Sequence, residues 1–280
     1  MRAILLISFL ERRSYMKKGI DISEHNGNIN MEKVKKSGIE FIILRLGYGK
    51  NQNQIDKNFK TNYEKAININ IPVGVYLYSY ATNINDSKEE AKLVLDNIKG
   101  LKIEYPIFID MEDADNYKAK RNVSNATCID ICETFCQEIE SAGYYVGIYA
   151  NLDWLNNKIN DNRLDRFDKW VAQWGNSCTY NKNYGMWQFS DKGNVTGISG
   201  NVDLNYSIYD YKNIIKKANL NHLTNSTNTV YHVVVKGDTL TLLAKKYNVN
   251  WKKIYELNKD IIGDDPNQIY PGQNLLIKEE

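Results

Sequence analysis

Three carboxylates, Asp110, Glu112 and Asp113, follow an apolar run in the stretch YPIFIDMED, residues 105–113. Side chains alternate between the two faces of a β-strand, so Phe108, Asp110 and Glu112 share one face, opposite Ile107 and Ile109. Acids two residues apart have Cα atoms roughly 6.6 Å apart and can converge on one glycosidic bond. Such a site needs one carboxyl that keeps its proton as general acid and a second that stays ionised near the anomeric carbon.

Spacing alone does not separate this chemistry from a solvated acidic turn, and Asp113 and Asp115 fit such a turn. Two further acids favour catalysis. Asp21 ends the first apolar run, in GIDISEHNG, and Asp203 lies in the last, in GNVDLN. First and last strands are neighbours when a barrel closes, so four carboxylates are expected around one rim.

The elements that must position these acids alternate between two patterns. Near-continuous apolar runs typical of parallel strands lie at residues 19–23, 41–49, 72–80, 105–113 and 144–150. Amphipathic helix patterns between them lie at residues 31–38, 58–69, 87–100 and 124–143. We expect Asp86 or Ser87 to cap the third helix and Ser124 or Asn125 the fourth. Three glycines mark helix ends, at Gly38, Gly100 and Gly143.

Three more strand-like runs follow after residue 150, at residues 169–174, 184–190 and 202–207. The gaps between them are too short for full helices. The chain therefore predicts an α/β fold of five βα units and three further strands, and eight strands close a small barrel. An open doubly wound sheet is the alternative, but it explains the last three strands less well.

The bulk composition narrows the class of function. The 280 residues carry a net charge of +2, which gives no argument for a nucleic-acid partner, and no stretch is long enough to span a membrane. Twenty Tyr and five Trp, several at strand ends, suit a sugar-binding cleft. Cys128, Cys132 and Cys136 recur every four residues, which indicates the buried stripe of a helix, and Cys178 lies far away. We expect no metal, no cofactor and no disulfide framework.

The motifs KGIDISEHNG, FIDMED, YVGIYAN, VAQW, MWQFS and VDLN together resemble the family-25 glycoside hydrolases, which are N-acetylmuramidases. The resemblance covers roughly residues 18–211. It implies an irregular (β/α)5β3 barrel that cleaves the β-1,4 bond between N-acetylmuramic acid and N-acetylglucosamine. Peptidoglycan glycan strands are the implied partner.

The resemblance also implies roles for individual residues. Glu112 is similar to the general acid, and Asp110 to a partner that stabilises charge at the anomeric centre or orients the substrate's acetamido group. Asp21 and Asp203 resemble supporting rim carboxylates. Further residues are similar to those that line the saccharide cleft or touch substrate, namely Tyr78, Tyr149, Trp174, Gln188 and His25. For His25, a surface-loop role is the open alternative.

A Ser/Thr/Asn-rich stretch precedes a second unit of about 50 residues. We expect the barrel at residues 17–219, a linker at 220–229 and the second unit at 230–280. Its motifs GDTL, AKKYNV and YPGQ resemble a LysM domain, a βααβ module that binds N-acetylglucosamine-containing glycans. The resemblance implies a glycan groove at Gly237, Asp238, Thr239, Ile261 and Ile262. Thr241 replaces an aromatic residue often found there, which bears on the strength of sugar binding.

The first 16 residues are expected to be a leader outside the barrel. The sequence ERRSY before Met16 is encodable as a translated ribosome-binding site, which makes Met16 the expected natural start. A small-residue cleavage site is missing, so we expect synthesis in the cytoplasm and release to the wall by lysis or a holin-type route. A secreted autolysin is the alternative.

Three rival functions compete with a muramidase of phage-endolysin or bacterial-autolysin type. A non-catalytic wall-binding protein on a degenerate barrel is disfavoured by the intact acids. A wall amidase or peptidase needs a zinc triad or a Cys–His pair, and neither is evident. A chitinase-type barrel has a longer strand motif that is richer in Asp. The sequence gives no oligomeric state.

Overall fold

The computed structural model describes residues 16–223 and 230–278. It contains two compact units that divide after Leu223. The expected leader lies outside the described residues except for Met16, and so does most of the expected linker. No helix in the described ranges is long and apolar enough to cross a membrane.

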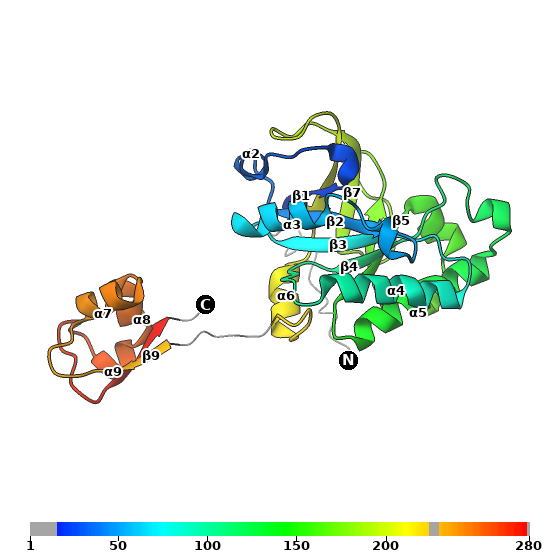
Figure 1. Ribbon diagram of the computed structural model, residues 1–280. Helices are drawn as coiled ribbons and strands as arrows, with labels where there is room; N and C mark the ends of the chain where they lie inside the picture. The colour runs from blue at the N-terminus through cyan, green and yellow to red at the C-terminus, as the bar shows by residue number, and fades with distance from the viewer. Residues whose placement is uncertain (1–15, 224–229, 279–280) are drawn as a thin grey trace. The chain divides into compact units, whose positions relative to one another are not determined.

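The first unit is a closed eight-stranded barrel in sequential strand order (Figure 1). Its strands are β1 (Lys17–Ile22), β2 (Phe41–Tyr48), β3 (Val73–Tyr78), β4 (Ile107–Asp110), β5 (Val146–Asn151), β6 (Asp168–Ala172), β7 (Met186–Gly193) and β8 (Val202–Ser207). Strands β1 to β7 run parallel, whereas β8 is antiparallel to both β7 and β1. The expectation of a barrel rather than an open sheet is confirmed.

Helices connect the first five strands, as the apolar periodicity predicts. They are α2 (Met31–Lys36), α3 (Phe59–Asn68), α4 (Ile84–Ile98) and α5 (Asn125–Ser141), with α6 (Tyr211–Lys217) after β8. Helices α4 and α5 pack side by side on the outside of the barrel (Figure 1). Only short helical turns, Trp154–Lys158 and Asn162–Leu164, separate β5 from β6. Further short turns lie at Glu24–Asn26, Gln52–Gln54 and Ala119–Arg121.

One expected helix cap is wrong. Helix α4 begins three residues before the expected start, and its cap is Asn83, whose side chain accepts a hydrogen bond from the backbone of Asp86. Asp86 therefore lies in the first turn of α4, where its negative charge interacts favourably with the helix dipole. Ser124 caps α5, within the expected pair. The three glycines at the expected helix ends have positive φ, at Gly38, Gly100 and Gly143.

The barrel strands separate two apolar clusters. Phe108 belongs to an aromatic-rich cluster with Phe41 and Trp170. Ile107 and Ile109 belong to a second cluster that includes residues of the surrounding helices. This arrangement confirms the expected alternation of the fourth strand, whose inner face leads to Asp110 and Glu112. The three helical cysteines are free and buried.

The barrel extends past its expected end at residue 219. Asn221 is buried, and its side-chain nitrogen donates to the carbonyls of Ile103 and Tyr105, at 3.0 and 3.1 Å. Its side-chain oxygen accepts from the backbone N–H of Tyr145 at 2.6 Å. The His222 ring packs against Tyr144, with ring centroids 4.7 Å apart. These contacts tie residues that look like a polar linker to the starts of β4 and β5.

The second unit is a small β-α-α-β fold with a core of its own. Its elements are β9 (Val230–Val233), α7 (Leu240–Tyr247), α8 (Trp251–Leu257), the short α9 (Lys259–Ile262) and β10 (Asn274–Lys278). The two strands pair antiparallel. The expected order of strand, two helices and strand is confirmed, with α9 added as a single turn after α8.

Candidate active site

Asp110 and Glu112 lie where β4 ends. Asp110 is the last residue of the strand, and its side chain is only 5% exposed. Glu112 follows two residues later and is partly exposed. Within the described residues, Asp110 Oδ1 is the single buried side-chain nitrogen or oxygen atom that has no hydrogen-bond partner. A buried oxygen without a protein partner is costly, so this atom is available to accept a hydrogen bond from outside the protein.

Asp21 and Asp203 face each other across the seam that closes the barrel. They are register partners on the antiparallel strands β1 and β8. Asp21 Oδ2 accepts hydrogen bonds from the side-chain amides of Asn205 and Gln188, at 2.7 and 3.1 Å. The two amides stabilise the ionised form of Asp21.

Indole and hydroxyl donors fix the orientation of both amides. Trp170 Nε1 donates to Asn205 Oδ1 at 2.8 Å, which leaves the amide nitrogen of Asn205 to face Asp21. Gln188 Oε1 accepts from the Tyr149 hydroxyl at 3.0 Å and from Trp174 Nε1 at 3.1 Å. The structure thus joins Asp21, Gln188, Tyr149 and Trp174 in one hydrogen-bonded network.

Asp21 and Asp203 together retain a proton near neutral pH. Burial, the charge of Asp21 and a hydrogen bond to Asp21 raise the pKa of Asp203 to about 8. Burial also raises the pKa of Asp21, but its hydrogen bonds to Asn205, Gln188 and Asp203 oppose that effect. The two amide donors favour the ionised form of Asp21, so the proton of the pair is favoured on Asp203.

The pKa values of Asp110 and Glu112, the two acids at the end of β4, are raised as well. Burial, followed by the charge of Glu112, raises the pKa of Asp110 well above its ordinary value. Burial raises the pKa of Glu112, and a hydrogen bond from the Asn151 side chain opposes this shift. The backbone N–H of Trp154 donates to Asn151 Oδ1 at 3.0 Å, so the Asn151 amide nitrogen is the group left for Glu112. A raised pKa in a partly exposed carboxyl is what a general acid requires near neutral pH.

Tyr78 and Trp174 extend the site outward from the acids. The Tyr78 hydroxyl accepts from the backbone N–H of Ala114 at 3.1 Å, and its ring lies 5.2 Å from that of Tyr80. Trp174 is 61% exposed although its indole nitrogen is anchored to Gln188. Half-buried and exposed rings beside carboxylates suit the apolar faces of sugars.

His25 lies in a separate group of polar contacts. Its Nε2 is 3.2 Å from Arg45 Nη1, and Arg45 also pairs with Asp56 at 2.8 Å and with Glu24 at 3.1 Å. His25 is exposed and contacts none of the four carboxyls directly, but its partner Arg45 on β2 acts electrostatically on Asp110. Both the substrate contact and the surface-loop alternative are compatible with this position.

Sequence reasoning missed three residues of the site. Asn205 lies two residues after Asp203, and Asn151 lies two residues after Tyr149. Residues two apart on a strand share a face, so both asparagines could have been predicted from their neighbours. Lys118 is buried beside Glu112, and its Nζ donates to the Glu112 carbonyl at 3.0 Å. Its position could not be predicted from a sequence pattern, because Lys118 lies in a loop, where side chains follow no regular alternation. The described residues contain no cluster of three or more His, Cys, Asp or Glu side chains that could hold a metal ion.

The expected groove residues of the second unit have structural partners. Asp238 accepts from the Val235 backbone and contacts His232 Nε2, both at 2.8 Å. Thr239 caps α7. Gly237 has a φ of 101°, which a residue with a side chain adopts only under strain. The two isoleucines differ, because Ile261 is 50% exposed whereas the side chain of Ile262 packs into the core.

Asp21 acts electrostatically on both Asp110 and Glu112, and Glu112 acts on Asp203, so the four carboxyls gather at one end of the closed barrel. Carboxyls grouped in this way, with aromatic side chains beside them, are typical of a glycosidase site. Comparison with known families agrees with this class. The chain belongs to the glycosyl hydrolases family 25, whose family model matches residues 20–198. Residues 232–278 match the LysM domain. The chain thus combines a barrel of glycosyl hydrolases family 25 with a LysM domain after it.

Individual proteins similar to this chain are also lysozymes, autolysins or endolysins by name. The autolytic lysozyme of Clostridium acetobutylicum is 29% identical over 188 residues, which are 67% of this chain and 54% of that protein. The chain therefore spans about half the length of this curated relative. The modular autolysin LytC from Streptococcus pneumoniae, solved with a synthetic peptidoglycan ligand, has a TM-score of 0.61 and 30% identity over 69% of this chain and 46% of its own. The CTP1L endolysin has a TM-score of 0.57 and 26% identity, over 71% and 69% of the two chains.

Proposed function

We propose that the protein cleaves the β-1,4 bond between N-acetylmuramic acid and N-acetylglucosamine in peptidoglycan, with Glu112 as the general acid. Glu112 is partly exposed, so a glycosidic oxygen can reach it, and its raised pKa keeps the proton available. The names of the relatives, an autolytic lysozyme and an autolysin solved with a peptidoglycan ligand, support this choice of substrate.

The observation that carries the proposal is the buried Asp110 oxygen without a partner. An N-acetylated sugar brings an amide N–H, which is the kind of donor this oxygen needs. We infer that Asp110 accepts the acetamido N–H and so directs the acetamido oxygen toward the anomeric carbon. This hydrogen bond also lowers the pKa of Asp110 on binding, because donors to a carboxylate favour its ionised form.

The remaining acids support this arrangement from across the barrel mouth. The Asp21 carboxylate, with Asp203 as its proton-bearing partner, places negative charge on the β1–β8 side of the site. We propose that it stabilises the positive charge that develops at the anomeric carbon. Trp174 and Tyr78 are proposed to contact neighbouring sugars, and His25 is proposed only as an outer contact.

The barrel and the second unit are proposed to act on one polymer. LysM modules and muramidase barrels both recognise glycan strands, so tethering raises the local concentration of substrate. Gly237, Asp238, Thr239 and Ile261 are proposed to line the glycan groove, and Ile262 to shape it through its backbone. A phage endolysin or a bacterial autolysin is compatible with this architecture, and release by lysis rather than secretion stays a prediction.

The test is digestion of purified peptidoglycan, followed by borohydride reduction and identification of the new reducing ends. N-acetylmuramic acid is expected at those ends. N-acetylglucosamine there, or new amino groups, would refute the muramidase proposal. Absence of any new reducing end would favour a non-catalytic wall-binding protein.

A single substitution tests the role of Glu112. Glu112→Gln keeps the shape of the side chain and removes the proton donor, so activity is expected to fall by roughly two orders of magnitude or more. The control is Glu64→Gln, which makes the same chemical change on the exposed face of α3. A Glu112→Gln enzyme with half of its activity would remove Glu112 from the mechanism.

A further inference from the structure

A buried lysine lies directly behind the proposed general acid. Lys118 is 2% exposed, and its Nζ donates to two backbone carbonyls, those of Glu112 and Ser79. The first carbonyl belongs to the residue that carries the acid, and the second lies just beyond β3. Burying an ammonium group costs free energy unless hydrogen bonds and a nearby negative charge compensate it. Groups that compensate Lys118 are therefore expected close by.

The loop after β4 is folded so that Lys118 points inward. Asp113 accepts hydrogen bonds from two successive backbone N–H groups, those of Lys118 at 2.7 Å and Ala119 at 2.8 Å. Lys118 Nζ also lies 5.8 Å from the centre of the Tyr78 ring, one of the proposed cleft residues. The lysine therefore contacts the backbone just after β4 and just after β3.

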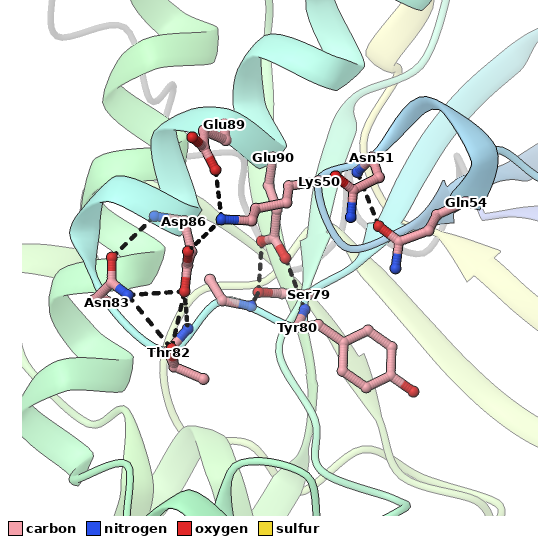
Figure 2. Close-up of polar contacts among 11 residues, drawn as sticks. Lys50, Asn51, Gln54, Ser79, Tyr80, Thr82, Asn83, Asp86, Glu89 and Glu90 are labelled. Atoms are coloured by element: carbon pink, nitrogen blue, oxygen red, sulfur yellow. Dashed lines mark hydrogen bonds and ion pairs between the residues drawn. The ribbon is translucent and has the colours of Figure 1, made fainter.

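The compensating charge comes from α4. Glu90 is fully buried, and its carboxylate accepts from the Ser79 hydroxyl and from the Tyr80 backbone N–H, both at 2.7 Å (Figure 2). Ser79 thus lies between the two charges, since its hydroxyl donates to Glu90 and its carbonyl accepts from Lys118. Figure 2 also shows Lys50 paired with Asp86 and Glu89, which holds the first turns of α4 against the loop after β2.

We propose that Lys118, with Glu90 as its counter-charge, is a positioning residue for catalysis that fixes the backbone of Glu112 and places a buried positive charge behind the acids of the cleft. The inference rests on the proposed function of Glu112. It assigns Lys118 no contact with substrate. Its effect on the reaction is transmitted through the geometry and the protonation of Glu112 and Asp110.

The charges around Lys118 and Glu90 determine how the protonation of the active-site acids depends on pH. Lys118 lowers the pKa of Asp110, Glu112 and Glu90, against the larger effect of burial on each. The other charged or titratable groups that act on the two acids come from other strands of the barrel, namely Asp21 on β1, Arg45 on β2, Tyr76 and Tyr78 on β3, Tyr149 on β5 and Asp203 on β8. Burial raises the pKa of Glu90 to about 7, so its charge changes in the range where the enzyme must work.

The test is the pH–rate profile of Lys118→Met on soluble glycan fragments. Loss of the cation raises the pKa of Glu112, so the general acid keeps its proton to higher pH and the alkaline limb is expected to move up by about one pH unit. Displacement of Glu112 is expected to lower kcat about tenfold or more, with a much smaller change in KM. Glu90→Gln removes the counter-anion, so its alkaline limb is expected to move the opposite way.

Two further variants keep the test decisive. Lys120→Met removes an exposed cation from the same loop and is expected to leave the profile in place. If Lys118→Met fails to fold because Glu90 is left uncompensated, the double variant Lys118→Met/Glu90→Gln removes both charges and should restore folding. Its kcat is expected to stay low, and its alkaline limb is expected to move upward by less than in Lys118→Met, because the two charge changes oppose each other and Lys118 acts more strongly on Glu112. A folded Lys118→Met variant with an unmoved alkaline limb and an unchanged kcat overturns the inference. If Glu112→Gln is inactive at the same time, the proposed function stands.

Discussion

Replacing Asp203 by asparagine is expected to stabilise the protein at pH 7 and to have little effect at pH 4. In the folded protein the pKa of Asp203 is raised to about 8, because the group is partly buried and faces Asp21. In the unfolded chain the carboxyl ionises near its ordinary value, about 4. The folded state therefore holds a proton that the unfolded state releases, and stability falls as pH rises from about 4 to about 8.

The size of the effect follows from this interval. Each pH unit contributes at most about 1.4 kcal/mol, so four units give a ceiling of about 5–6 kcal/mol. Part of the shift belongs to the coupled Asp21–Asp203 pair, so a gain of about 1–3 kcal/mol at pH 7 is expected. The asparagine amide does not titrate and still offers an N–H to the Asp21 carboxylate.

The assay is the free energy of unfolding from urea titrations at about pH 4, 6, 7, 8 and 9, for the wild type and the Asp203→Asn variant. The difference between the two proteins should grow with pH and level off above pH 8. Glu64→Gln, on an exposed face, controls for the loss of one negative charge. A difference that is the same at pH 4 and pH 8, or a variant that is less stable at pH 8, would refute the reasoning.

Two further predictions concern the end of the barrel and the second unit. Asn221→Ala removes the partners of two carbonyls and one N–H and is expected to lower the free energy of unfolding by about 3 kcal/mol, as measured by urea titration. Asn70→Ala, at an exposed position with a similar positive φ, isolates the backbone contribution and should cost about 1 kcal/mol. Truncation after Leu223 is expected to weaken pull-down by intact walls and to spare hydrolysis of soluble fragments. Equal pull-down with and without the second unit would contradict this, whereas truncation after Leu220 should destabilise the barrel because Asn221 is lost.

The sequence by itself determined the barrel and the inner face of its strands. Apolar runs of strand length alternate with amphipathic helices, and this periodicity reports which side of each element is buried. Alternation also placed Phe108 and Asp110 on one face, and the structure agrees. These properties are local, because the pleat of a strand and the turn of a helix repeat every few residues.

Only the tertiary structure decided how the acids are paired and protonated. Asp21 and Asp203 lie near opposite ends of the barrel sequence, and it is the antiparallel closure of β8 on β1 that makes them register partners. Burial and the two amides on Asp21 then determine which of them holds the proton. No local pattern specifies these relations, since they depend on which strands meet.

The position of Lys118 and the end of the barrel were likewise decided by tertiary contacts. Lys118 looks like one more surface lysine in a charged loop, yet Asp113 folds that loop so that the buried ammonium group donates to the Glu112 carbonyl. Asn221 looks like part of a polar linker, yet its amide satisfies backbone groups at the starts of β4 and β5. Polarity in a sequence states that a side chain needs partners, but only the fold determines whether water or buried backbone supplies them.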